Sequence, residues 1–316
     1  FGHVTPNYYE RLKASYVLAS LMGPEHAIIL AGGIGSRMLP ASSLVPKEIM
    51  PLIDVPAINY LIAEIKDAGI NNIHLVINEQ KAWIADLLNY NNKNIDYLQN
   101  IRKDISSNIL NPLENMNLFV HIQEEQLGFA NAVSYALDSI DGPFLVLLGD
   151  NILMNQHSGP MTDLGLTRSK ASLKLVEKFN QNLRPVVGLH EVSDEELSSF
   201  GVVNKSKDKV IEIIEKPAIE DSPSNSVLCG RYLFTDDFKE LLLKYPVTEF
   251  GELQSIVIQK HWIESNGGLD YVDLDDHEWY DSGRPEMWLK AQIDHALKRN
   301  DLENNLREWL NQKLSE

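Results

Sequence analysis

The sequence predicts an α/β fold in which helices cover both faces of a mostly parallel, mixed central sheet. From His26 onward, short apolar runs of strand length alternate with amphipathic stretches, a pattern typical of strands and helices wound into such a sheet. The first apolar run leads into a glycine-rich turn, and two later runs end in polar residues. The 316 residues, 44% hydrophobic and 23% charged, suffice for one large domain or two ordinary ones with a substantial core.

The first half of the chain follows this alternation closely. Apolar runs predict strands over residues 26–30, 73–77, 118–122 and 144–148. Helices are predicted over 56–68, where Pro56 suits a helix start and Gly69 a stop, and over 83–88 and 129–137. Residues 89–117 are polar and rich in asparagine with weak periodicity, which predicts an excursion from the core.

Beyond residue 180 the pattern becomes richer in strands. Strands are predicted over 184–190, 201–203, 210–214 and 227–234, and alternation over 271–275 indicates a half-exposed strand. Helices follow over about 236–243, 250–265, 285–298 and 302–314. Trp279, Trp288 and Trp309 fall near strand ends or helices, where packing in the core is expected. The acidic cluster at 194–196 is interpreted as a solvated face.

Charge and cysteine content exclude several classes of function. The chain has 28 Lys and Arg against 45 Asp and Glu, a formal charge of -17, which argues against nucleic-acid or membrane-surface partners. The single cysteine, Cys229, excludes an intrachain disulfide and a cysteine-rich metal site. No apolar stretch approaches the roughly 20 residues of a membrane span, and residues 1–25 are interpreted as a peripheral segment. The cytoplasm is the expected location.

Two features near the first strand suggest binding of phosphates. Residues 31–37 read Ala-Gly-Gly-Ile-Gly-Ser-Arg, and closely spaced glycines let backbone N–H groups turn toward a phosphate. The loop lacks the lysine of a P-loop and the third glycine of a dinucleotide fingerprint. Lys47 follows in Pro-Lys-Glu, where it supplies a second cation close to the loop. Each feature alone also fits an ordinary turn or a surface lysine.

Taken together, residues 31–51 resemble the signature of sugar-1-phosphate nucleotidylyltransferases, and most closely that of bacterial UTP–glucose-1-phosphate uridylyltransferases. Further matching segments follow in the same order and cover nearly everything from residue 26 to 310: residues 123–132, 149–151, 200–203, 215–217, 224–225, 230–232, 251–254 and 280–283. The chain departs from the family pattern at Ser42, Ser43 and Arg284.

The resemblance implies a role for each matching residue. Arg37 and Lys47 would hold the β- and γ-phosphates, and Lys216 the sugar phosphate. Nucleotide binding is implied for Ala31, Gly32, Gly33, Gly35, Gln123, Gly128 and Asp150, and sugar-phosphate binding for Gly201, Glu215, Lys216 and Asn225. A glutamine amide offers a donor and an acceptor, which suits uracil or thymine at Gln123, although this residue could instead cap its strand.

Asp150 and Asp281 match the two acidic positions that hold a divalent cation, here expected to be Mg²⁺. Magnesium prefers carboxylate oxygens and completes its shell with water and phosphate oxygens, so two aspartates suffice. Asp150 ends a continuous apolar run, where an unpaired carboxylate would be costly. For Asp281, Asp-Ser-Gly also fits an ordinary turn.

The implied fold is a three-layer, Rossmann-like nucleotidyltransferase domain over 26–284, with a nucleotide-binding half (26–155), a sugar-phosphate-binding half (156–284) and C-terminal helices (285–316). The implied reaction converts an NTP, with UTP favoured, and glucose 1-phosphate to UDP-glucose and pyrophosphate. A dTTP-dependent thymidylyltransferase and a non-catalytic sugar-nucleotide-binding homologue are the alternatives. A dinucleotide oxidoreductase ranks low, because no acidic residue ends the strand at 73–77. A homodimer or homotetramer is expected.

Overall fold

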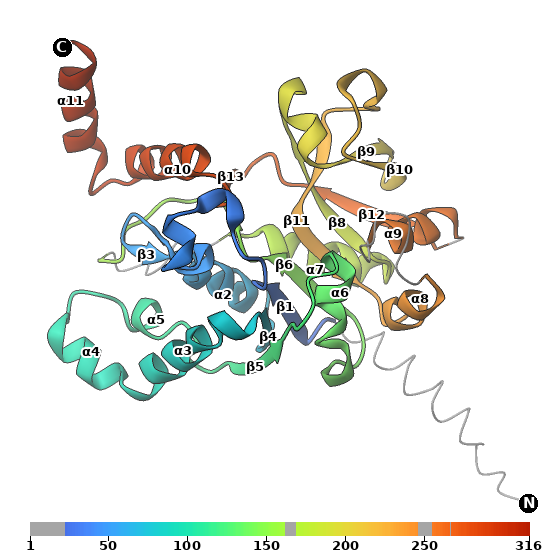
Figure 1. The fold of residues 1–316 in the computed structure, drawn as a ribbon, viewed down its shortest axis with the longest axis horizontal. Helices are drawn as coiled ribbons and strands as arrows, with labels where there is room; N and C mark the ends of the chain where they lie inside the picture. The colour runs from blue at the N-terminus through green and yellow to red at the C-terminus, as the bar shows by residue number, and fades with distance from the viewer. Residues whose placement is uncertain (1–22, 162–168, 246–254, 266) are drawn as a thin grey trace, which may run out of the picture.

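The computed structural model describes residues 23–161, 169–245, 255–265 and 267–316. One nine-stranded sheet runs through the molecule in the order β5-β4-β1-β6-β11-β8-β12-β10-β9. Figure 1 shows helices packed against both of its sides. The three-layer α/β architecture predicted from the alternating pattern is therefore confirmed. Of the described helices, none combines the length and the apolar character needed to cross a bilayer.

The first half of the sheet is parallel. Its strands are β1 (His26–Leu30), β4 (Asn72–Ile77), β5 (Asn117–Ile122) and β6 (Phe144–Leu148). β1 lies between β4 and β6, and β5 adds to the far edge of β4. All four strands occur where apolar runs predict them. Because parallel strands end at the same edge, the segments after β1, β5 and β6 are brought together there.

The second half of the sheet is mainly antiparallel. Its strands are β8 (Val186–Glu191), β9 (Gly201–Ser206), β10 (Lys209–Glu215), β11 (Ser226–Phe234) and β12 (Leu269–Asp273). β11 joins the two halves by pairing antiparallel with both β6 and β8. β12 runs parallel to β8 and antiparallel to β10. The sheet is thus mixed, as expected.

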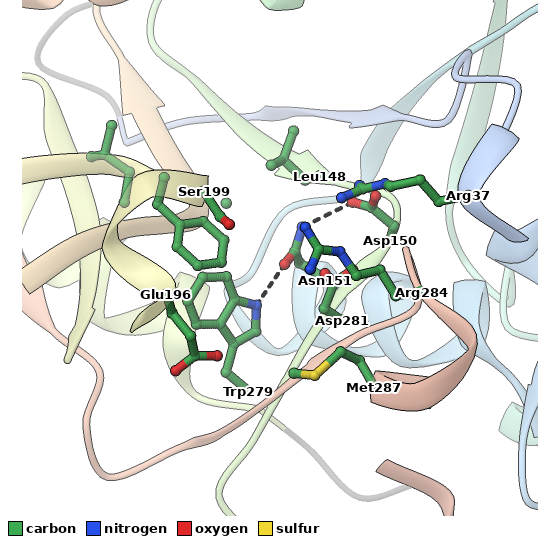
Figure 2. A pocket seen from close by; sticks show the side chains of 13 residues that line it. Arg37, Leu148, Asp150, Asn151, Glu196, Ser199, Trp279, Asp281, Arg284 and Met287 are labelled. Carbon is green, nitrogen blue, oxygen red and sulfur yellow. Dashed lines mark hydrogen bonds between the residues drawn. The ribbon is translucent and has the colours of Figure 1, made fainter. Parts of the chain in front are cut away.

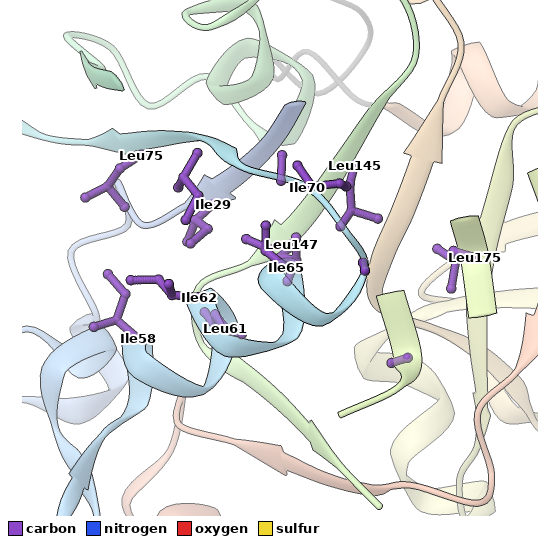
Figure 3. Close-up of a cluster of buried hydrophobic side chains, with 14 of the residues drawn as sticks. Ile29, Ile58, Leu61, Ile62, Ile65, Ile70, Leu75, Leu145, Leu147 and Leu175 are labelled. Carbon is purple, nitrogen blue, oxygen red and sulfur yellow. The ribbon is translucent and has the colours of Figure 1, made fainter. Parts of the chain in front are cut away.

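Two apolar layers hold the helices on the sheet. On one face, α2 (Ala57–Asp67) buries Ile58, Leu61, Ile62 and Ile65 against β1, β4 and β6 (Figure 3), and α7 (Ala171–Asn182) joins the same layer. On the other face lie α6 (Phe129–Ser134), α8 (Phe238–Lys244) and α9 (Ser255–Glu264). The predicted helix over 129–137 ends at Ser134, before a 3-10 turn at Leu137–Ser139.

Several elements were not predicted from the sequence. The helix predicted over 83–88 is confirmed as the start of α3 (Trp83–Lys93), but the asparagine-rich segment that follows continues this helix and forms α4 (Ile95–Ile101) and α5 (Ser107–Leu110) rather than an irregular excursion. Weak periodicity was misleading here, because few of these side chains are buried. A separate ribbon pairs β7 (Asn151–Met154) with β13 (Glu278–Asp281). The short strands β2 (Pro51–Leu52) and β3 (Val55–Pro56) form another two-stranded sheet.

The C-terminal helices extend away from the sheet. α10 (Pro285–Lys298) packs through Trp288 and Ala291 on the β7–β13 ribbon, whereas α11 (Glu303–Leu314) buries none of its residues and projects from the body (Figure 1). Core packing is therefore confirmed for Trp288 but wrong for Trp309, which is 54% exposed. The predicted N-terminal segment 1–25 lies almost wholly outside the described residues, as does the motif at 251–254.

Three histidines on the neighbouring parallel strands β1, β4 and β5 lie next to one another. His26 Nδ1 lies 2.9 Å from His74 Nε2, and His74 Nδ1 lies 2.9 Å from His121 Nε2. Burial lowers the pKa of the fully buried His74 to about 3, and both neighbouring imidazoles add to this effect. His74 is therefore neutral in the folded protein at any pH near 7.

This buried imidazole makes the fold sensitive to acid. Between pH 6.5 and about 3 the unfolded chain binds a proton at His74 that the folded chain does not. For this group, the free energy of unfolding therefore decreases by about 1.4 kcal/mol for each unit by which the pH is lowered. We expect His74→Phe to reduce this slope by about one proton, measured by urea unfolding at a series of pH values. An unchanged slope in the variant would contradict the assignment.

Candidate active site

The carboxyl ends of β1, β5 and β6 bring three predicted site segments together. The ladder continues past each strand: Ala31 N donates to the carbonyl of Val76, Gln123 N to that of Ile77, and Gly149 N to that of Leu30. The glycine loop, Gln123 and Asp150 therefore surround one cavity of about 350 Å³. This glycine-loop cavity is lined by Leu30, Gly32, Gly33, Lys47, Glu48, Gln123, Gln126, Gly128, Phe129, Ala132, Leu148 and Asp150.

A buried ion pair between Lys81 and Glu48 is hydrogen-bonded to the backbone of the glycine loop. The Lys81 ammonium donates to the carbonyls of Ala31 (2.8 Å) and Gly33 (2.6 Å) and to both carboxylate oxygens of Glu48 (2.9 and 2.7 Å). Both side chains are almost fully buried. Burial lowers the pKa of Lys81 and raises that of Glu48, and the charge of each partner opposes these shifts. Sequence reasoning missed Lys81, although a lysine so soon after a strand end was a usable signal.

Local geometry explains why two positions of the glycine loop, Gly32 and Gly35, carry glycine. A Cβ on Gly32 would stand 2.2 Å from Gln123 Oε1, so a larger residue would displace that amide. Gly35 begins the turn to Ser36–Met38 with φ +73°, a conformation that side chains rarely adopt. Ser42, where the chain departs from the family pattern, donates its hydroxyl to the carbonyl of Gly35 at 2.7 Å.

The structure pairs two of the predicted site residues directly. Lys47 Nζ forms an ion pair with Asp150 Oδ2, and the two side chains are 12% and 20% exposed. Asn151 Nδ2 donates to the other oxygen, Asp150 Oδ1, at 2.8 Å. The second cation of the sequence motif thus lies at the end of β6, between the glycine loop and the carboxylate.

The β7–β13 ribbon places Asp281 beside Asp150. Asp281 pairs with Asn151 in this ribbon, and Ser282 N donates to the carbonyl of Asp150 at 2.9 Å. Burial raises the pKa of Asp281, and the negative charge of Asp150 adds to the rise. Opposing contributions come from the Gly283 N–H, which donates to Asp281 Oδ1 at 2.6 Å, and from the charges of Arg37 and Lys47. The two predicted metal ligands are therefore close enough for their charges to interact.

A second cavity of about 240 Å³ opens on the other side of Asp150. We call it the Trp279 cavity; it is lined by Arg37, Leu148, Asp150, Asn151, Glu196, Ser199, Phe200, Leu228, Gly230, Trp279, Asp281, Arg284 and Met287. Figure 2 shows the guanidinium groups of Arg37 and Arg284 near the two carboxylates, with Trp279 on the opposite wall. Leu148 and Asp150 line both cavities, which therefore meet at the end of β6.

Several lining residues of the Trp279 cavity were not predicted. Trp279 was expected in the core, and it packs half-buried against two buried apolar clusters. It also contacts Phe200 with ring centroids 4.9 Å apart and donates through Nε1 to Asn151 Oδ1 at 2.5 Å. Strand periodicity offered a signal, because Trp279 and Asp281 lie two residues apart and share a face of β13. Glu196, interpreted as part of a solvated face, also lines the cavity.

The predicted sugar-phosphate residues lie close to Phe200. Glu215 pairs with Gly201 across β10 and β9, and Lys216 N donates to the carbonyl of Phe200 at 3.0 Å. The exposed side chains of Lys216 and Glu215 approach to 3.5 Å. None of these three lines the Trp279 cavity as the structure describes it.

Asn225, predicted to bind the sugar phosphate, forms hydrogen bonds within a surface loop. Its Nδ2 donates to Asp194 Oδ1 at 2.7 Å and to the carbonyl of Val192 at 3.1 Å. These contacts fix the loop before β11 to the start of the turn at residues 194–199. Contact with a sugar hydroxyl through Asn225 remains a prediction.

The two carboxylates fit a small oxygen-ligated cation by the chemistry of their donors. Asp150, in the turn before β7, and Asp281, at the end of β13, offer carboxylates at one end of the ribbon, which is the kind of donor that magnesium prefers. Among the described residues no group of three or more His, Cys, Asp or Glu is arranged to hold a metal ion. A cation at this pair would therefore take its remaining ligands from water and from phosphate oxygens.

Comparison with known proteins shows the family to which this chain is related. A family model described as nucleotidyl transferase matches residues 26–297. UTP–glucose-1-phosphate uridylyltransferase 2 of Staphylococcus saprophyticus is 31% identical over 294 residues, covering 90% of this chain and 96% of that protein. The uridylyltransferase of Bacillus subtilis is 29% identical over 292 residues, with 89% and 94% covered. A crystal structure of UDP-glucose pyrophosphorylase complexed with UDP-glucose superposes with a TM-score of 0.72 at 25% identity, covering 87% of this chain and all of that one.

Proposed function

Because the chain belongs to the nucleotidyl transferase family, we propose that it transfers a uridylyl group from UTP to glucose 1-phosphate, giving UDP-glucose and pyrophosphate. The observation that carries the proposal is the meeting of the two cavities at Asp150. A nucleotide in the glycine-loop cavity would present its α-phosphate at the same point as a sugar phosphate in the Trp279 cavity. The named relatives and the UDP-glucose complex support this choice of substrates.

The reaction needs alignment and charge neutralisation rather than an activated side chain. The phosphate of the sugar is already anionic at neutral pH, and one of its oxygens attacks the α-phosphorus. The bond from that phosphorus to the bridging oxygen breaks, and pyrophosphate leaves with both bonding electrons. No proton transfer is required, so no serine, cysteine or histidine nucleophile has to be provided.

In this proposal different residues bind the two anionic substrates. The backbone of Gly32, Gly33 and Gly35 surrounds the nucleotide phosphates, and Lys47 and Arg37 neutralise the departing pyrophosphate. Lys216 holds the attacking phosphate, with Glu215 and Gly201 toward the sugar; these three lie outside the lining of the Trp279 cavity but next to its lining residue Phe200. The base lies against Gln123 and Gly128. A strongly acidic protein can bind two anions in this way because Arg37, Lys47 and Arg284 line the two cavities.

Asp150 and Asp281 would hold Mg²⁺. When bound there, the ion would polarise the α-phosphate and lower its negative charge. Burial and the negative charge of Asp150 both raise the pKa of Asp281, and a divalent cation between the two carboxylates would relieve their repulsion. Lys47, which pairs with Asp150 Oδ2 in the structure, and Arg37 also lie close enough to influence Asp281.

The function is tested by measuring pyrophosphate release with glucose 1-phosphate and Mg²⁺, using UTP, dTTP, ATP, CTP and GTP in turn. We expect the highest kcat/KM with UTP and no release when glucose 1-phosphate is omitted. Preference for dTTP would instead identify a thymidylyltransferase. Nucleotide binding by calorimetry without turnover of any of the five would identify a non-catalytic homologue.

The metal site gives a separate prediction. Chelation by EDTA is expected to abolish turnover, and Asp281→Asn to raise the Mg²⁺ concentration for half-maximal activity by on the order of 10- to 100-fold. Asp208→Asn, in the exposed turn between β9 and β10, serves as the control with unchanged Mg²⁺ dependence. Asp281 does not belong to the metal site if its variant responds to Mg²⁺ as the control does.

A homodimer or homotetramer and a cytoplasmic location complete the proposal. The interface is proposed on the C-terminal helices, because α11 buries none of its residues in the single chain and leaves Trp309 54% and Leu314 85% exposed. The mass in solution, measured by light scattering, tests the assembly.

A further inference from the structure

Asn131, in the first turn of α6, fixes the orientation of a neighbouring amide that lines the glycine-loop cavity. Its Oδ1 accepts from the backbone N–H of Leu127 at 3.4 Å and from Gln123 Nε2 at 3.1 Å. A backbone N–H can only donate, so the Asn131 atom that faces Leu127 must be the oxygen. The same oxygen faces Gln123, and therefore the Gln123 atom opposite it must be the amide nitrogen.

The contact with Asn131 holds the Gln123 amide in one of its two possible orientations relative to the cavity. Its side chain is almost buried, at 6% exposure, and Oε1 lies on the side of Gly32, where an added Cβ would be 2.2 Å away. Oε1 is an acceptor, and Nε2 keeps one N–H beyond the one given to Asn131. Rotating the amide by half a turn would set the Gln123 oxygen against the Asn131 oxygen, two acceptors without a hydrogen between them.

The pattern of an acceptor next to a donor matches one class of pyrimidine. Uracil and thymine offer an N3–H donor beside a carbonyl acceptor, whereas cytosine offers an N3 acceptor beside an amino donor. A glutamine held in the observed orientation is complementary to the first pattern and opposes the second. A glutamine free to rotate could accommodate both by exchanging its oxygen and nitrogen.

We infer that Asn131 is a positioning residue for base selection: it locks the Gln123 amide in the orientation that accepts UTP and rejects CTP. The inference rests on the proposed function, in which a nucleoside triphosphate occupies the glycine-loop cavity with its base at Gln123. Asn131 itself acts through Gln123 and is given no contact with the base.

The test compares kcat/KM for UTP and CTP in the wild-type protein, Asn131→Leu and Asn131→Asp, with glucose 1-phosphate and Mg²⁺. Leucine is similar in size to asparagine but accepts no hydrogen bond, so we expect the UTP-to-CTP ratio to fall about tenfold or more. Aspartate retains an acceptor for both donors, and a carboxylate is favourable in the first turn of a helix. Asn131→Asp should therefore keep the wild-type ratio.

The ratio separates positioning from a structural role. If Asn131 only supported the fold, leucine would lower kcat/KM for both nucleotides alike and leave the ratio unchanged, which would overturn the inference. A double-mutant cycle adds a second readout: in a Gln123→Leu background, Asn131→Leu should not change the ratio further, and a further change would also overturn it. Asn131 is only half-buried, and Asn131→Ala provides a second variant without the acceptor.

The wild-type measurement distinguishes this inference from the proposed function. Turnover of UTP by the wild-type protein with an unchanged ratio in Asn131→Leu refutes the inference alone. A wild-type protein that turns over none of the nucleotides refutes the proposed function. In that case, binding of UTP and CTP to the same variants, measured by calorimetry, decides the inference by the same ratio.

Discussion

Replacing Lys47 by methionine is expected to lower kcat about 10²- to 10³-fold, the loss found when one stabilising donor is removed from a developing negative charge. In the proposed reaction Lys47 works on the departing pyrophosphate, whose charge grows as the bond to the α-phosphorus breaks. The effect should therefore fall on kcat more than on KM for UTP.

The same replacement is expected to change stability little. The Lys47–Asp150 pair is partly open to solvent, at 12% and 20% exposure, and Asp150 keeps its hydrogen bond from Asn151. We expect a loss of about 1 kcal/mol in the free energy of unfolding, measured by urea titration. Lys103→Met, at an exposed position, is the control for losing a lysine. Parallel losses of turnover and stability would show that Lys47 acts on the fold instead.

Arg231→Met is expected to destabilise the protein by about 3–5 kcal/mol, because it leaves a carboxylate buried without its cation. Arg231 on β11 donates to both oxygens of Glu64 on α2, at 2.7 and 2.8 Å, and the two side chains are 0% and 1% exposed. Ser172 N and its hydroxyl also donate to Glu64 Oε1, at 3.1 and 2.5 Å. These contacts tie the sheet to α2 and α7 through charge as well as apolar packing.

This buried pair also supports the site. Arg231 Nη2 donates to the carbonyl of Asn151 at 3.0 Å, directly after Asp150. Urea unfolding of Arg231→Met and of Glu64→Leu/Arg231→Met measures the effect, and the double variant should lose less than the single one, because no charge is left buried. A single variant that loses under 1 kcal/mol would contradict the importance of the pair. Arg231→Lys tests whether two parallel donors are needed.

The strands of the parallel half, and the segments that follow them, could be predicted from the sequence alone. Each strand there is a continuous apolar run, and the rule that parallel strands share a carboxyl edge was enough to group the glycine loop, Gln123 and Asp150. These features are local, because burial on both faces requires an uninterrupted apolar stretch. Helices with one apolar face, such as α2, were predictable for the same reason.

Contacts between residues that are far apart in the sequence became visible only in the tertiary structure. Asp281 reaches Asp150 through the β7–β13 ribbon, Lys81 reaches the glycine loop through carbonyl oxygens, and Asn131 orients Gln123 through one shared acceptor. None of these contacts can be predicted from hydrophobic periodicity, because each depends on the positions of two individual groups and not on a pattern of hydrophobicity. The second half of α3 and the helices α4 and α5 formed where polar composition predicted an irregular excursion, since packing against neighbours can outweigh weak amphipathicity.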